Sequence, residues 1–234
     1  MCNSRGTGRL VEDVMAYQFQ PQRYGGPMTA VKPQSMLGQV LGITALGMCI
    51  TALAVYLFPN VGAMSWLAFI GGFILLFAIN GTRANPALSL MLFYAFTFLE
   101  GIGIAPIVTA YAHLPNGAEI VYNAALTTGL GMFAVGAIVY ATGLDLRRFQ
   151  GWLFGALIVL VLVGVISMFV RFVSPTIYSW ATLIIFTGFV FIDFARIRAG
   201  GDGLTPVQMA TSIYLDVLNI FLALLRIFGD RDRD

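Results

Sequence analysis

Hydrophobic residues occur in seven long runs between residue 36 and the end of the chain, and short polar or glycine-rich segments separate the runs. Each run is close to the ~20 residues that an α-helix needs to cross a bilayer. The separating segments contain turn residues, such as Asn80-Gly81 and Gly200-Gly201-Asp202-Gly203. The pattern predicts an all-α integral membrane protein with seven transmembrane helices, over Met36–Phe58, Gly62–Ile79, Pro86–Tyr111, Ala118–Thr142, Trp152–Phe172, Pro175–Ile197 and Val207–Phe228.

The last of these runs carries a regular set of polar residues. They follow one another at intervals of 4, 4, 3 and 7, so they form one stripe along a helix, made of Gln208, Ser212, Asp216, Asn219 and Arg226. A membrane helix cannot turn such a stripe towards lipid, because lipid offers no hydrogen-bonding partner. We therefore predict that the last helix is central and is wrapped by the other six.

Composition agrees with a membrane protein, since 59% of the residues are hydrophobic and only 10% are charged, against about 25% charged in soluble domains. We expect residues 1–35 to form a disordered polar tail, residues 36–229 one membrane domain, and residues 230–234 a charged C-terminal tail. The net charge of +2, with no basic patch interleaved with aromatic residues, argues against nucleic acid as a partner.

Arginine and lysine predict the orientation in the membrane. Basic residues occupy the N-terminal tail and every second loop, namely Arg5, Arg9, Arg23 and Lys32, then Arg83, then Arg147 and Arg148, then Arg196 and Arg198. This distribution predicts a multi-pass protein with a cytoplasmic N-terminus. Seven spans then place the C-terminus outside, and the alternative is that the last run re-enters and leaves on the cytoplasmic side.

Three acidic residues lie well inside the predicted spans: Glu100, Asp193 and Asp216. Each costs at least about 2.5 kcal/mol at the bilayer centre. Asp193 lies ~6 Å and Asp216 ~14 Å from the cytoplasmic ends of adjacent antiparallel helices, so modest sliding would bring the two carboxylates together. Neighbouring carboxylates in a low-dielectric site share a proton or hold a cation. The alternatives are an ion pair of Asp193 with Arg196, and a structural hydrogen bond of Asp216 with Asn219.

The remaining polar residues extend this hypothesis. Glu100, ~21 Å into its span, is expected to line a pore further out; the alternative is a protonated acid bonded to a backbone carbonyl. Arg83 is expected to reach Asp193 and act as a latch that closes the cytoplasmic mouth of the pore. The alternative is that Arg83 only contributes to the excess of basic residues on the cytoplasmic side. Ser212 and Asn219 are expected to line the pore. Calcium prefers oxygen ligands, so Asp193, Asp216 and Glu100 are candidate calcium ligands.

Three stretches resemble the Bax inhibitor-1 family in its bacterial branch, the third most specifically: FTFLEGIGIAPI, FIDFARI and SIYLDVLNIFLALLRIFGDRD. The resemblance covers about residues 35–229. It implies seven helices with the last between two three-helix layers, a bacterial inner-membrane location, and a pH-sensitive calcium leak. The two regulatory aspartates of that family match Asp193 and Asp216, and its arginine at the end of the second helix matches Arg83. Glu100 stands where the bacterial branch often has an acidic residue. Some members are described as modulating a membrane-anchored AAA protease.

The leading hypothesis is a pH-gated calcium conductance without a cofactor, whose partners are the bilayer, calcium and protons. The alternatives are a proton-coupled secondary transporter and a regulatory membrane protein acting on an AAA protease. We do not expect an enzyme, because the sequence has no HExxH motif and a single histidine, His113. The GxGD motif of presenilin-type aspartyl proteases is also absent, and YLDV stands at Asp216.

Overall fold

The computed structural model describes residues 33–167, 169–170 and 173–231. This part contains seven long helices and a short 3₁₀ helix, η1 (Arg147–Phe149), and no strand is found in it. All seven are long and apolar enough to cross a membrane, which confirms the predicted fold class. The helices are α2 (Pro33–Leu57), α3 (Met64–Gly81), α4 (Pro86–Ala112), α5 (Gly117–Thr142), α6 (Gln150–Ser167), α7 (Pro175–Arg198) and α8 (Pro206–Arg231).

Local sequence explains where several helices begin. The Asn85 side chain accepts a hydrogen bond from the Leu88 backbone N–H at 3.2 Å and so caps the first turn of α4. Proline occupies the first position of α4, α7 and α8, where a missing N–H costs nothing and the fixed φ suits a helix. Asn116, just before α5, has a left-handed φ of 60°, which asparagine adopts more readily than most residues.

Most predicted helix ends differ from the structure by one or two residues, and three boundaries differ more. Helix α2 begins at Pro33, inside the predicted tail, of which residues 1–32 lie outside the described residues. Helix α8 continues to Arg231, past the predicted start of the C-terminal tail, and residues 232–234 are likewise outside the described part. Helix α6 is described as far as Ser167, and its predicted end, Phe172, lies outside the described residues. Hydropathy could not locate that end, because the residues that follow it, Phe169 and Val170, are also apolar.

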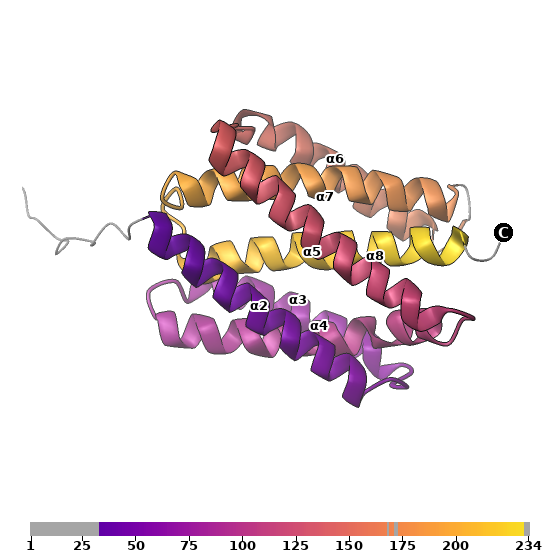
Figure 1. The fold of residues 1–234 in the computed structure, drawn as a ribbon. Coiled ribbons are helices and arrows are strands. Elements are labelled where there is room, and N and C mark those ends of the chain that lie inside the picture. The colour runs from indigo at the N-terminus through magenta and orange to yellow at the C-terminus, as the bar shows by residue number, and fades with distance from the viewer. Residues whose placement is uncertain (1–32, 168, 171–172, 232–234) are drawn as a thin grey trace, which may run out of the picture. The chain divides into compact units, whose positions relative to one another are not determined.

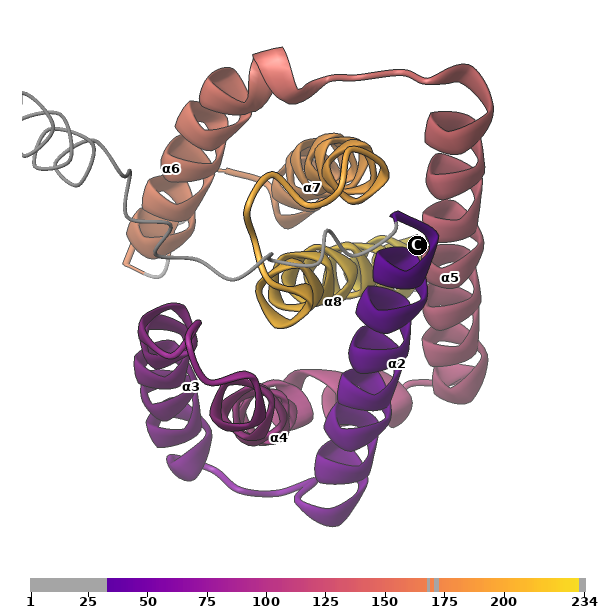
Figure 2. The ribbon, with the colours of Figure 1, turned by 90° about the vertical axis from the view of Figure 1, so that its left-hand side faces the viewer.

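The helices form two groups of three with α8 between them (Figure 1). In one group α4 packs against α2 and α3; in the other α7 packs against α5 and α6. Helix α8 contacts α2, α4, α5 and α7, and the end-on view in Figure 2 shows it enclosed by them. Half of its spanning residues are buried, the largest share of the seven helices, against 6% for α6. The predicted central position of the last helix is therefore confirmed.

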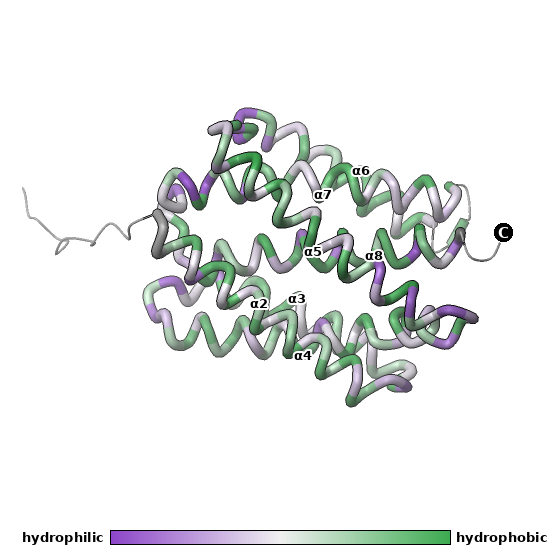
Figure 3. The backbone as a smooth tube through the Cα atoms, viewed as in Figure 1, coloured by the Kyte–Doolittle hydropathy of each residue, from purple (hydrophilic) through white to green (hydrophobic). Residues whose placement is uncertain are grey.

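The outer surfaces of the bundle are apolar. Most positions along the helices are hydrophobic, and hydrophilic residues are frequent in the connecting loops (Figure 3). Large exposed side chains are frequent on α3 and α6, as at Trp66, Phe73 and Trp152. An exposed apolar surface of this extent is expected where lipid is the solvent.

A close crossing of α2 and α4 depends on Gly101. A Cβ atom added at this glycine would lie 2.6 Å from the backbone oxygen of Thr51 and 2.6 Å from the Cβ of Ala54. Both positions are closer than van der Waals contact permits, and one of the atoms is backbone. The absence of a side chain at Gly101 is thus what allows the two helices to approach.

Replacing Gly101 with alanine should therefore destabilise the bundle. We expect the free energy of unfolding to fall by about 1–3 kcal/mol, the usual cost of overpacking a core. Gly151 on α6 provides a matched control, since no atom lies within 4 Å of its added Cβ; Gly151→Ala should be neutral or slightly stabilising. Unfolding in mixed micelles measures both variants, and equal stabilities would contradict the proposed α2–α4 contact.

Candidate functional site

The two predicted aspartates lie at the packed interface of α7 and α8. Asp193 is fully buried and Asp216 is 4% exposed. The end of α7 and the start of α8 lie at the same end of the bundle. Asp193 is five residues, or ~7.5 Å along the helix axis, from that end, and Asp216 is ten residues, or ~15 Å, from it. The extended contact between these helices brings the carboxylates into electrostatic range of one another. The two carboxylates thus interact electrostatically, and their role as a proton-sharing pair stays a prediction.

Arg196 supplies the positive charge of this site. Its Nη1 donates a hydrogen bond to Oδ1 of Asp193 at 3.1 Å, one helical turn away. The side chain of Arg196 is 16% exposed and that of Asp193 1%, so the arginine lies between the end of α7 and the buried carboxylate. Arg196 also lies within electrostatic range of Asp216. The ion pair considered as an alternative for Asp193 is therefore present, and it occurs within the aspartate site.

Each aspartate retains a carboxylate oxygen without a partner. The buried Oδ2 atoms of Asp193 and Asp216 have no hydrogen-bond donor among the described residues. Ser212, one turn before Asp216 on α8, interacts with the Asp193 carboxylate. Burying acceptors without donors is unfavourable, so these oxygens are expected to take up a proton or a cation. We refer to Asp193, Asp216, Arg196 and Ser212 as the aspartate site.

Asn219 does not bond to Asp216. Its amide Nδ2 donates instead to the backbone oxygen of Leu215 at 2.8 Å, within α8. The alternative interpretation of Asp216, as a structural hydrogen-bond partner of Asn219, is therefore not seen. Asn219 is half-buried and faces a cavity between α6, α7 and α8.

Arg83 lies in the segment between α3 and α4 and is exposed. It makes no ion pair or hydrogen bond with any residue that the structure describes. The cation that bonds Asp193 is Arg196, from the same helix. In this conformation the predicted latch between Arg83 and Asp193 is not formed, and the role of Arg83 stays a prediction.

Glu100 lies on the other side of α8 from the aspartates. Its Oε1 packs against α3, 2.9 Å from where a Cβ on Gly72 would lie, and it is within electrostatic range of Tyr214 on α8. Within the described ranges, no three His, Cys, Asp or Glu side chains gather closely enough to hold a metal ion. Glu100 therefore does not complete a three-carboxylate calcium site with Asp193 and Asp216 in this conformation.

A buried hydroxyl network, which sequence reasoning missed, fixes this opposite side of α8. The hydroxyls of Tyr214 and Thr51 are 2.7 Å apart, and Thr51 Oγ1 donates to the backbone oxygen of Thr97 at 2.9 Å. Phe93 and Phe96 contact the Tyr214 ring edge-on. Tyr214 is fully buried. The only signal was a tyrosine two residues before Asp216, and a lone tyrosine in an apolar helix does not reveal its partners.

An ionic cluster outside the spans joins two loops at the end of the bundle nearest Asp193. Arg147 bonds Asp145 at 2.7 Å in the α5–α6 connection and Asp202 at 2.9 Å in the α7–α8 connection. The hydrogen bonds from Arg147 lower the pKa of Asp145 from 3.8 to about 2. Because this pKa is depressed, the stabilising contribution of Asp145 is present above pH ~4 and is lost as the pH falls through about 2.

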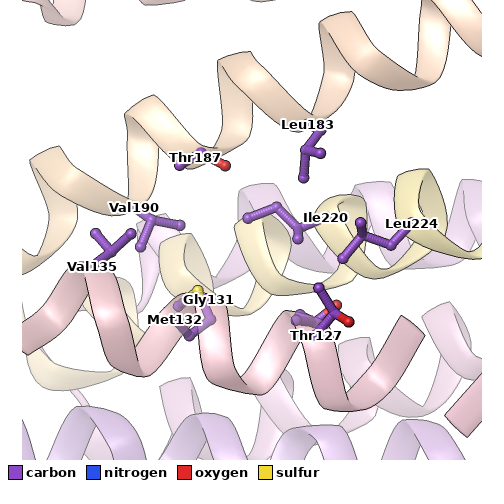
Figure 4. Close-up of a pocket in the computed structure, with 10 residues that line it drawn as sticks. Thr127, Gly131, Met132, Val135, Leu183, Thr187, Val190, Ile220 and Leu224 are labelled. Carbon is purple, nitrogen blue, oxygen red and sulfur yellow. The ribbon is translucent and has the colours of Figure 1, made fainter. Parts of the chain in front are cut away.

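A small cavity of about 150 Å³ lies between α5, α7 and α8 (Figure 4). One of its walls is Val190, a single turn from Asp193 along α7. The lining is otherwise mostly apolar, with hydroxyls from Thr127, Thr128 and Thr187. Such a lining offers too few oxygens to replace the hydration shell of calcium. The cavity is thus an imperfection in packing beside the aspartate site and not itself a cation site.

Removing Arg196 should destabilise the protein, because the buried carboxylates then lose their counter-charge. We expect Arg196→Gln to lower the free energy of unfolding by about 3 kcal/mol, because it leaves Asp193 buried without its counter-charge. Asp193→Asn should cost less, since the more deeply buried charge of the ion pair is removed and Arg196 keeps Asp216 within electrostatic range. The double variant should be no less stable than Arg196→Gln alone, as a double-mutant cycle of unfolding in mixed micelles would measure. Additive losses would show that the two side chains are energetically independent.

Comparison with known proteins assigns the chain to a family. The model of a family described as inhibitor of apoptosis-promoting Bax1 matches residues 33–233. An uncharacterized membrane protein of Vibrio cholerae is 28% identical over 188 residues, 80% of this chain and 82% of that protein. An uncharacterized protein of Helicobacter pylori strain J99 is 32% identical over 75% of this chain and 77% of its own. With its seven helices, central α8 and the match over nearly all of the described residues, the chain belongs to the Bax inhibitor-1 family of membrane proteins.

Proposed function

We propose that this protein is a pH-sensitive cation leak of the bacterial inner membrane, with calcium as the transported ion. The observation that carries the proposal is the aspartate site, where Asp193 and Asp216 are buried with one unpartnered oxygen each and share one arginine. Buried ionisable groups in membrane spans typically mark ion pathways or proton relays. A family member with such a site is suited to respond to protons.

Charge counting explains the sensitivity to pH. With both carboxylates ionised, the site holds two negative charges against the single positive charge of Arg196, a net charge of −1. One proton on the pair makes the site neutral. The attraction between α7 and α8 at this level therefore depends on protonation, as does the affinity of the site for a cation. A change in that attraction is the gating event that we propose.

Calcium is proposed because the available ligands are carboxylate oxygens, which hard cations prefer. The unpartnered Oδ2 atoms of Asp193 and Asp216 supply two ligands. Glu100, on the opposite side of α8, is proposed as a separate acidic position along the path, and Ser212 and Asn219 as polar positions on α8. Arg83 is proposed to latch the inner mouth in a conformation other than the present one.

The ionic cluster of Asp145, Arg147 and Asp202 is not expected to contribute to the pH response of the flux. The pKa of Asp145 is about 2, so this carboxylate stays ionised across the pH range of a flux measurement. Asp145 therefore serves as a matched control, because it is an aspartate at the same end of the bundle that does not titrate in that range.

We expect calcium flux into proteoliposomes to change across about pH 5 to pH 8, and Asp216→Asn to remove most of that change, since the pair can then no longer exchange its proton. Asp145→Asn should keep the pH response of the unmodified protein. Flux that does not change with pH, or an Asp216→Asn variant with the unmodified response, would contradict the proposal.

Saturable uptake of an organic solute driven by a proton gradient, without calcium flux, would instead support a proton-coupled transporter. Absent flux together with co-purification of an AAA protease would support a regulatory role.

We also propose a cytoplasmic N-terminus, because the helix connections that contain or adjoin Arg83, Arg147, Arg148 and Arg198 lie at the end of the bundle where α2 begins (Figure 1). Seven spans then put the C-terminus outside. Alkaline phosphatase fused after Asp234 should be active, and fused after Gly201 it should be inactive. Fusions of green fluorescent protein at the same two positions should show the reverse. Phosphatase activity only at Gly201 would invert the proposed orientation.

A further inference from the structure

A cavity of about 160 Å³ lies between α6, α7 and α8, towards the end of the bundle where α7 begins and α8 ends. Helix α6 packs mainly against α7, so this space lies where α6 stands away from α8. Arg226 of α8 and Tyr178 of α7 line the part nearest that end. Deeper along the axis the lining is mixed, with the apolar side chains of Leu157 of α6 and Phe186 of α7 and the amide of Asn219 of α8. The lining of the cavity is therefore partly polar and partly apolar.

Arg226 is the one cation among the described residues that line this cavity, and none of them supplies a counter-charge. The side chain is half-buried and makes no ion pair or hydrogen bond with any residue in the described ranges. Asp230, one turn further along α8, accepts a hydrogen bond from Thr176 at 3.2 Å and lies outside ion-pair distance of Arg226. A guanidinium inside a membrane domain normally has an anionic partner or a backbone carbonyl.

The other polar groups of the cavity do not supply an anion. Thr182 donates to the backbone oxygen of Tyr178 at 2.9 Å, and the Asn219 amide donates to Leu215. The Tyr178 hydroxyl lies within electrostatic range of Arg226 and makes no hydrogen bond within the described part of the chain. Two donors, the guanidinium and the phenol, therefore face a space in which no described lining residue is a negatively charged acceptor.

The depth of Arg226 matches the level of lipid phosphates. Helix α8 has 26 residues, so it is ~39 Å long and exceeds the ~30 Å hydrocarbon core. Arg226 lies five residues before the end of the helix, ~7.5 Å along the axis. A centred helix thus puts its Cα about 3 Å inside the hydrocarbon boundary, from which a long arginine side chain reaches the phosphate layer.

We propose that this cavity binds the headgroup of an anionic phospholipid, with the phosphate on Arg226 and Tyr178 and the start of an acyl chain against Leu157, Val161 and Phe186. Guanidinium and phosphate form paired, charge-assisted hydrogen bonds. A free anion would satisfy Arg226, but it would leave the apolar part of the cavity empty. The apolar part of the lining therefore favours a lipid over a free phosphate, and the two proposed phosphate ligands, Arg226 and Tyr178, are not residues of the aspartate site.

Native mass spectrometry of the full chain released from nanodiscs tests the proposal. In nanodiscs of phosphatidylcholine mixed with phosphatidylglycerol, the protein should retain phosphatidylglycerol selectively. Arg226→Gln should reduce that retention about tenfold, since it removes the charged donor. Arg226→Lys keeps the charge without the two-pronged geometry and should give an intermediate loss. Tyr178→Phe should weaken retention less than Arg226→Gln.

Arg148 supplies the matched control, because it is a cation without an ion pair in the described residues and lies at the opposite end of the bundle. Arg148→Gln should leave retention unchanged, and thermal unfolding in neutral detergent should show that all variants fold. In a parallel arm, inorganic phosphate should not raise the unfolding temperature of the unmodified protein. Protection by phosphate that Arg226→Gln abolishes would assign the site to a free anion and overturn the lipid. Unchanged lipid retention in Arg226→Gln would overturn the site.

Discussion

A polar side chain inside a bilayer must find its partner within the protein, and this requirement organises the whole bundle around α8. Lipid cannot solvate Asp216 or Tyr214, so the helix that carries them is enclosed by α2, α4, α5 and α7. The peripheral helices α3 and α6 carry apolar side chains outward and are free to contact lipid. The two groups of three helices follow from this single need to cover the polar positions of α8 with neighbouring helices.

The two faces of α8 are satisfied in different ways. Towards α4, a neutral network of Tyr214, Thr51 and the Thr97 backbone oxygen is complete, and aromatic rings pack around it. Towards α7, the aspartate site retains two unpartnered carboxylate oxygens beside one arginine. A completed neutral network favours one arrangement of its helices, whereas a site with unsatisfied charge has different energies in its different protonation states. This contrast suits a helix that is anchored on one side and adjustable on the other.

The sequence was sufficient for the number of helices, the central position of α8 and the pairing of α7 with α8. Hydropathy reports the length of each span, and the spacing of Gln208, Ser212 and Asp216 reports a helical face, so these features are local properties of the chain. That Asp193 and Asp216 lie within electrostatic range was also within reach, because a short loop joins their helices and limits how far apart they can lie. Helix ends such as Ser167 were not, because apolar residues continue past them.

Only the tertiary structure decided which side of α8 each polar residue occupies and what it contacts. The sequence grouped Glu100 and Arg83 with the aspartates, but Glu100 packs against Gly72 on the opposite side and Arg83 is exposed. It also gave no sign that Thr51 bonds Tyr214, 163 residues away. The physical reason is that periodicity fixes how a residue is oriented about its own helix axis. The rotation, depth and crossing of each helix against its neighbours depend on packing contacts such as Gly101 against Thr51, which are distant in sequence.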